Sequence, residues 1–382
     1  MKNWIPYRLG DFLERKHDSV SVDSFTKYKR ITIKTKGQGI ELRDEVEGVD
    51  IGTKNQFMAN QNQFLLSKID AMNGAFGIVP EECDKGIITG NFWTYDINEK
   101  IIDREYLRLL CIKQEFTKFS LEASEGTTNR RYLRENKFLN LPISLPLIPE
   151  QQRIVSKIES VKQQLEQIEK LRAGQTKDIK NLLFSKYTDL IEVAEWLPMK
   201  EVAPIIRREV KLNDEALYPE LGIRCFGKGT FHKPALTGLE VATKKIFQIK
   251  QGDLVFSNVF AWEGGIAVAK EEDNDRYGSH RFISCVAHKE KALEEFLCFH
   301  FLSPKGLEDI NACSPGGAGR NKTLGLDKLM KIKIPVPDFT SQKEFVELLH
   351  KVNAIKNQHT EIEKELNQLM PALLDKAFKG EL

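Results

Sequence analysis

Two long stretches of the chain place apolar residues every three or four positions, with charged and polar residues between them. The first runs from Pro149 to Tyr187 and the second from Phe345 to Leu373. A mean spacing of about 3.5 residues predicts a helix with a narrow apolar seam, as in a coiled coil. A helix of about 35 residues would be about 50 Å long, too long to lie inside a compact domain. The expected seam residues are Ile154, Ile158, Val161, Leu165, Ile168, Ile179, Leu182, Phe345, Leu349, Val352, Leu366 and Leu373.

Prolines precede both predicted helices, Pro146 and Pro149 in the first case and Pro335 and Pro337 in the second. Proline blocks the continuation of a helix from upstream and favours an extended segment before it. Pro371 lies inside the second pattern, so we expect it to kink or split that helix. Each helix could instead pack along its own globular domain. Two narrow seams in one chain favour pairing of the two helices with each other.

The chain is also an internal repeat. When the 382 residues are shifted by 191, half the length, segment 132–187 falls on 323–378 without a gap. The two halves also open alike, with Trp4-Ile5-Pro6 and Trp196-Leu197-Pro198. Identical residues in the aligned segments include Ile143/Ile334, Pro146/Pro337, Gln151/Gln342 and Leu182/Leu373. The chain is therefore expected to be two copies of a globular block followed by a helix.

The globular blocks are predicted to span 1–148 and 196–337, and the helical segments 149–195 and 338–382. Within the blocks, the β-branched segment Tyr28–Thr35 alternates as a strand does, and apolar runs at 64–66 and 254–256 indicate buried strands. The segments 105–110 and 293–299 are typical of helices. The fold class is therefore α+β: two mixed α/β blocks alternating with two long helices that pair as an antiparallel coiled coil.

The composition is that of a soluble globular protein, with 41% hydrophobic and 29% charged residues. No apolar run approaches the roughly 18 residues of a membrane span, and the first residues do not resemble a signal peptide. Six scattered cysteines suit a reducing compartment, so a cytoplasmic location is expected. The net charge of +2 conceals an uneven distribution of 57 basic and 55 acidic residues.

Basic residues cluster in segments 26–36 and 127–137, and again at 319–323 after a glycine-rich stretch. Such clusters are often only solvated faces, but finding one at the same place in both halves favours nucleic acid. Glycine loops with adjoining Arg, Asn and Thr suit phosphate clamping and contacts with base edges. The candidate DNA contacts are Lys27, Lys29, Arg30, Lys34, Lys36, Thr128, Asn129, Arg130 and Arg131 in the first half, and Arg224, Lys228, His280, Arg281, Arg320, Asn321 and Lys322 in the second.

The sequence offers no convincing catalytic or metal site. Segment 222–229 resembles a phosphate-binding P-loop, but Gly229 stands where a Ser or Thr would hold magnesium, and no helix pattern follows. The pairs Cys285/His288 and Cys298/His300 lack a second pair at zinc-like spacing. No serine lies in a nucleophile elbow. We therefore expect a binding protein with no catalytic residue and no metal.

The chain resembles the specificity subunit of type I restriction–modification enzymes. The residues that carry this resemblance are the proline-rich segment 141–155 with its echo at 332–342, the C-terminal segment 369–382, the loop Gly126–Arg130 and the segment 67–80. The second copy departs from the pattern, because Thr340-Ser341-Gln342-Lys343 stands in place of Pro149-Glu150-Gln151-Gln152.

The resemblance implies a non-catalytic subunit that selects a double-stranded DNA sequence. Each block would be a target recognition domain that reads one half of an asymmetric bipartite site. The helices would set the spacer and dock two modification subunits, which bind S-adenosylmethionine and methylate adenine. Restriction subunits would add an ATP- and magnesium-dependent endonuclease, so this chain itself would hold no cofactor. The alternative is a coiled-coil interaction scaffold without DNA specificity.

Overall fold

The computed structural model describes residues 4–127, 130–242, 244–316 and 322–382. The chain divides into two compact units, Met1–Lys170 with Ile362–Leu382 and Leu171–Glu361. Each unit contains one globular block together with one end of each long helix. The mixed helix and strand architecture and the internal repeat are as the sequence predicts.

The block of the first unit is built on two small sheets. The four-stranded sheet has the order β2 (Leu13–Lys16), β10 (Phe92–Ile97), β7 (Phe64–Ser67) and β8 (Phe76–Ile78). The five-stranded sheet has the order β3 (Ser19–Ser21), β6 (Asn55–Ala59), β9 (Gly86–Ile88), β4 (Lys27–Ile33) and β5 (Ile40–Glu47). The remaining elements are α1 (Arg104–Ile112), α2 (Gln114–Glu122), α3 (Glu135–Leu139) and the hairpin β11 (Ser124–Thr127) and β12 (Arg130–Leu133).

The block of the second unit repeats this plan. One sheet has the order β15 (Ile205–Ile206), β22 (Phe282–Cys285), β19 (Leu254–Ser257) and β20 (Ile266–Val268). The other has the order β17 (Thr230–Thr237), β16 (Leu217–Ile223), β21 (Tyr277–Ser279) and β18 (Ile246–Gln248). The helices are α5 (Met199–Val202), α6 (Gly238–Val241), α7 (Glu294–Leu302), α8 (Pro304–Ala312) and α9 (Leu326–Leu329).

The strand orders of the two blocks correspond, so the repeat extends into the blocks, where their sequences differ. The order β2-β10-β7-β8 matches β15-β22-β19-β20, and β6-β9-β4-β5 matches β18-β21-β16-β17. In both sheets of this second kind one pair is parallel, β4 with β9 and β16 with β21. The strands and helices predicted from the sequence at 28–35, 64–66, 105–110, 254–256 and 293–299 are present.

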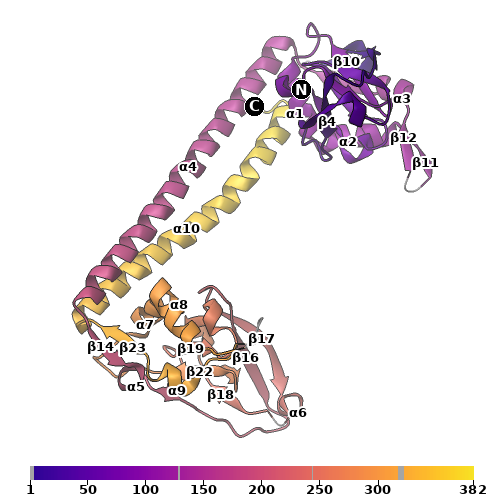
Figure 1. Cartoon of the computed structure of the whole chain (residues 1–382). Helices are drawn as coiled ribbons and strands as arrows, with labels where there is room; N and C mark the ends of the chain where they lie inside the picture. The colour runs from indigo at the N-terminus through magenta and orange to yellow at the C-terminus, as the bar shows by residue number, and fades with distance from the viewer. Residues whose placement is uncertain (1–3, 128–129, 243, 317–321) are drawn as a thin grey trace. The chain divides into compact units, whose positions relative to one another are not determined.

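The two long helices are α4 (Ile148–Glu192) and α10 (Phe339–Phe378), each continuous in Figure 1. A short antiparallel strand pair precedes each helix: β1 (Ile5–Arg8) pairs with β13 (Pro142–Leu145), and β14 (Glu195–Pro198) pairs with β23 (Lys333–Val336). Pro371 lies within α10 and does not split it, contrary to one of the two outcomes expected from the sequence. None of the helices in the described residues combines the length and apolar character needed to cross a bilayer.

In each unit the beginning of one long helix packs with the end of the other, so the two helices run antiparallel there. In the first unit the core contains Ile154 and Ile158 of α4 together with Ala377 of α10. In the second it contains Tyr187 of α4 and Phe345 of α10, whose ring centroids are 6.4 Å apart. The helix ends also insert into the blocks, since the rings of Phe378 and Tyr106 lie 5.2 Å apart.

The predicted seam residues differ in burial. Ile154, Ile158, Phe345 and Val352 are buried, and Val161, Leu165, Ile179, Leu349, Leu366 and Leu373 are half-buried. Ile168 and Leu182 are exposed. The prediction that these two residues are seam residues is therefore wrong, and Leu183 is buried in place of Leu182. One turn further along α4, Tyr187 packs against Phe296 and Phe299 of α7 as well as Phe345 of α10. Leu183 belongs to the same core, so the buried face of α4 here is set by two helices.

Candidate nucleic-acid interface

Each block has a glycine-rich hairpin loop that is held to a second loop by the same pair of backbone hydrogen bonds. In the first block the N–H groups of Lys36 and Gly37 donate to the carbonyls of Asn73 and Gly74, at 2.7 and 2.9 Å. The matching bonds of the second block run from Phe226 to Glu263 and from Gly227 to Gly264, at 2.7 and 2.9 Å.

In the first block the close approach of the two loops requires glycine at position 74. A Cβ atom at Gly74 would come within 2.9 Å of the backbone of Lys36. Lys36 and Phe226 themselves adopt a φ of 60°, the left-handed region. The loop shape is therefore the same in both blocks, while the exposed side chain at its turn is a cation in one and an aromatic ring in the other.

A second pair of backbone hydrogen bonds is also repeated in the two blocks. In each block one residue is bonded to two other segments of the chain. In the first, the N–H of Lys68 donates to the carbonyl of Asn91, and the carbonyl of Lys68 accepts from the N–H of Leu133, at 2.9 and 2.8 Å. In the second, Asn258 makes the same two bonds with Arg281 and Leu324, at 2.7 and 2.8 Å. In the first block these bonds link the turn before β10 to the last residue of the basic hairpin, and in the second they link the turn before β22 to the segment that follows the glycine-rich stretch.

Two of the basic residues in or just after β4 form ion pairs with acidic residues of β5. Arg30 lies opposite Asp44 and donates to both its carboxylate oxygens, at 2.7 and 2.6 Å. The ion pair holds the pKa of Asp44 below its usual value, because the guanidinium stabilises the carboxylate. Lys34 pairs with Glu41 at 2.6 Å.

Lys27 and Lys29 lie opposite Glu47 and Glu45 in the strand register. Lys36 is exposed and has no ion pair among the residues that the structure describes. Lys27 and Lys29 form no ion pair there either, but each has an acidic residue opposite it, so Lys36 is the member of the first cluster that we expect to meet a phosphate.

In the second block the predicted residues lie on two loops. Arg224 donates to the carbonyl of Thr230 at 2.9 Å, and Lys228 is exposed with its amine 5.9 Å from the ring of Phe226. His280 and Arg281 are exposed in the turn between β21 and β22.

Arg207 anchors that turn through hydrogen bonds to its backbone. Its guanidinium donates to the carbonyls of Phe282 and His280, at 2.7 and 3.3 Å, and lies 4.5 Å from the ring centroid of Phe247. The turn that carries His280 and Arg281 is thus fixed before any ligand binds.

Lys322 lies at the end of the glycine-rich segment. Its amine donates to Asn311 at 2.8 Å and lies 4.8 Å from the ring centroid of Trp262. The candidates Thr128, Asn129, Arg320 and Asn321 lie outside the described residues. Arg130 pairs with Thr127 in the β11–β12 hairpin, and Arg131 beside it is half-buried.

Sequence reasoning missed Lys68, Asn258 and Trp262, which the fold places among the candidates. Each is a single polar or aromatic residue in a loop with no local pattern. Lys68 and Asn258 could have been found by following the offset of 190 residues between Ser67 and Ser257, which end the matching strands β7 and β19.

The segment that resembles a P-loop is the β16–β17 hairpin, and Thr230 begins a strand where a nucleotide site needs a helix. Within the described residues, no group of three His, Cys, Asp or Glu side chains gathers to hold a metal. His300 is buried, with Nδ1 2.6 Å from the Tyr187 hydroxyl. Burial raises the pKa of the Cys298 thiol to about 12, so it stays protonated near neutral pH.

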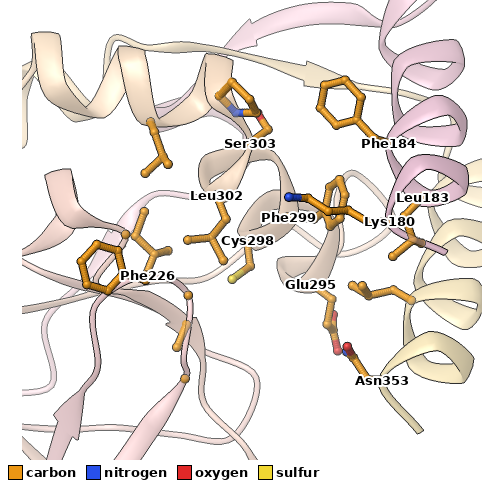
Figure 2. Close-up of a pocket in the computed structure, with 18 of the residues that line it drawn as sticks. Lys180, Leu183, Phe184, Phe226, Glu295, Cys298, Phe299, Leu302, Ser303 and Asn353 are labelled. Atoms are coloured by element: carbon orange, nitrogen blue, oxygen red, sulfur yellow. The ribbon is translucent and has the colours of Figure 1, made fainter. Parts of the chain in front are cut away.

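The second unit also contains an open groove of about 1380 Å³, shown in Figure 2. Its lining includes Phe184 of α4, Phe226 of the hairpin loop, Cys298 and Leu302 of α7, and Asn353 of α10. In the first unit, α1 has Arg108 at the position that matches Cys298. This arginine pairs with Glu159 of α4 at 2.6 Å.

The fold and the repeated loops define a class of protein. It is a binding protein with two blocks that share a scaffold and differ in the side chains they present. The sequence matches the family model described as type I restriction modification DNA specificity domain, at residues 1–174 and 188–368. The chain belongs to this family, as the sequence resemblance indicates, and is the subunit that provides DNA sequence specificity in a type I restriction–modification system.

One relative is the specificity subunit of the type I restriction enzyme MjaVIII from Methanocaldococcus jannaschii. It is 23% identical over 408 residues, which cover 98% of this chain and 92% of the relative. The HsdS subunit from Thermoanaerobacter tengcongensis has a similar crystal structure, with a TM-score of 0.64, 21% identity, and coverage of 100% of this chain and 98% of that chain. A chain from a structural study of type I restriction–modification assembly and conformational transition matches with a TM-score of 0.67, 20% identity, and coverage of 100% and 99%. The two solved structures support the fold.

Proposed function

We propose that each recognition block reads one half of an asymmetric bipartite DNA site. The observation that carries this proposal is the pairing of a repeated backbone with different exposed side chains. The bonds of Lys68 recur at Asn258 and those of Lys36 recur at Phe226, although the residues differ. Two blocks with the same scaffold suit the approximate twofold symmetry of duplex DNA, and their different side chains imply different half-sites.

Helices α4 and α10 would set the unread spacer between the half-sites and dock two modification subunits. Apolar side chains that the fold leaves exposed on these helices support such docking. Leu171 is 66% exposed, Leu369 42% and Ile362 40%. Exposed apolar side chains at intervals along a helix are suited to contacts with another protein.

Catalysis would belong to the partners in the cytoplasmic complex. The modification subunits would hold S-adenosylmethionine and methylate adenine, and restriction subunits, where present, would use ATP and magnesium. This chain would contribute selection of the site and placement of the partners, with no catalytic residue and no cofactor of its own.

The test is to co-express the chain with its modification subunit in a host that lacks adenine methylation and to map the methylated adenines. A bipartite asymmetric motif is expected. Replacing residues 1–148 with the corresponding block of a relative should change one half of the motif and leave the other half and the spacer unchanged. Methylation without a defined motif, or a swap that alters both halves, would contradict the proposal. Lack of salt-dependent DNA affinity in the assembled complex would favour the scaffold alternative.

A further inference from the structure

We propose that positions 68 and 91 in the first block, and the matching positions 258 and 281 in the second, determine which bases each block reads. The inference rests on the proposed reading of one half-site by each block. It assigns this task to Lys68 and Asn91 in one block and to Asn258 and Arg281 in the other.

The backbone at these positions is fixed in the same way in both blocks. The bond from Lys68 to Asn91 is 2.9 Å and that from Asn258 to Arg281 is 2.7 Å. The preceding serine is buried in both blocks, and its N–H donates to the matching loop at 3.0 Å in the first and 2.8 Å in the second. A rigid frame of this kind presents side chains at defined positions, as direct readout of base edges requires.

The side chains on this frame differ in chemistry. The first block places a lysine at the first position and an asparagine at the second. The second block places an asparagine and then an arginine. Arg and Lys suit the O6 and N7 acceptors of guanine, whereas Asn suits the N6 and N7 of adenine. We therefore expect one guanine contact and one adenine contact in each half-site. In the first block position 68 would read guanine and position 91 adenine. In the second block position 258 would read adenine and position 281 guanine.

The two cationic side chains at these positions are not held by ion pairs within the part of the chain that the structure describes. Neither Lys68 nor Arg281 forms an ion pair within the described residues, in contrast to Arg30 with Asp44. Arg281 is exposed on the turn that Arg207 holds through two carbonyls. The side-chain oxygen of Asn258 is buried and has no hydrogen-bond partner among the described residues, so a rotation of this side chain would be needed to bring it to a base. The two cations are available for a ligand, and the backbones at these positions are held by the hydrogen bonds described above.

The experiment uses the full chain assembled with its modification subunit and selects bound sequences from a random DNA pool. Arg281→Ala should reduce discrimination at one base pair of the second half-site by about 10-fold and leave the first half-site unchanged. Lys289→Ala, which removes an exposed cation elsewhere in the same unit, is the matched control and should leave both half-sites unchanged. The double variant Lys68→Asn with Asn91→Arg should shift the preference of the first half-site only.

Arg281→Lys separates base reading from phosphate contact, because it keeps the charge and removes the two-pronged donor. We expect relaxed preference with an unchanged salt dependence. The inference is overturned if Arg281→Ala weakens binding to all sequences alike, or if all these variants keep the wild-type preference. Failure of the proposed function would look different, since the wild-type complex itself would then select no bipartite site.

Discussion

Gln151 and Gln342, which are 191 residues apart, make the same three hydrogen bonds at the beginning of the two long helices. The Gln151 side-chain oxygen accepts from the N–H of Asp103 at 2.8 Å, and its amide donates to the carbonyls of Ile101 and Pro146, at 2.9 and 2.8 Å. Gln342 repeats this with Leu293, Lys291 and Pro337, at 3.0, 3.1 and 2.8 Å. Both side chains are fully buried. Each long helix is thus fastened to its block by a glutamine that satisfies three backbone groups.

Replacing this glutamine should destabilise the protein. Gln151→Leu leaves the N–H of Asp103 and two carbonyls without their partner, and each unpaired buried group costs about 1–3 kcal/mol. We expect a lower midpoint of urea unfolding for the full chain. Gln152→Leu is the matched control, because Gln152 is exposed on the same turn. Equal midpoints for the two variants would show that the three bonds contribute nothing to stability.

The ion pair of Arg30 predicts a contrast in the salt dependence of DNA binding. Lys36→Ala should reduce the slope of log affinity against log salt by about 1, as expected for loss of one phosphate contact. Arg30→Ala should leave the slope nearly unchanged, because Asp44 already neutralises the guanidinium. Fluorescence anisotropy of the assembled complex on a fixed duplex at several salt concentrations measures both slopes. A larger change for Arg30→Ala than for Lys36→Ala would contradict the assignment.

The buried His300 predicts a loss of stability in mild acid. Burial lowers its pKa to about 4, below the ordinary value of 6.5. Between these values the unfolded chain binds a proton that the folded chain does not, so stability falls as the pH drops from about 6.5 towards 4. At pH 5 this amounts to a loss on the order of 2 kcal/mol relative to neutral pH.

The variant His300→Asn tests this linkage, since the amide can still hydrogen-bond the Tyr187 hydroxyl but does not titrate. Urea unfolding at pH 7.5 and pH 5 should show a smaller difference for the variant than for the wild type. The same pH dependence in both proteins would place the responsible group elsewhere.

Pro371 offers a test of helix continuity. It is exposed within α10, where a proline removes one helical hydrogen bond. Pro371→Ala should therefore stabilise the protein by about 1–3 kcal/mol. The control is Lys180→Ala, at the matching position of α4, which should change the unfolding midpoint little. Destabilisation by Pro371→Ala would contradict the view that the proline weakens α10.

The repeat and the long helices could be predicted from the sequence because each depends on a periodic pattern. Such a pattern is spread over many residues and can be read without knowing the fold. The pairing of charges could not, because the partner of Arg30 is set by strand register across a hairpin. The inward position of Leu183 rather than Leu182 depends on α7, which packs against α4 from far away in the sequence. The offset of 190 residues would have shown that Lys68 and Asn258 correspond, but only the folded backbone places them beside Asn91 and Arg281.

Two segments that are far apart in the sequence are fastened beside the beginning of α4. Strand β1 pairs with β13, which leads directly into that helix, and the carbonyl of Leu382 accepts a hydrogen bond from Arg153 at 2.7 Å. The first unit therefore combines residues 1–170 with residues 362–382, and its core includes Ala377 of α10. Because the second recognition block lies between these segments in the sequence, the first unit can complete its core only after the second block has been synthesised.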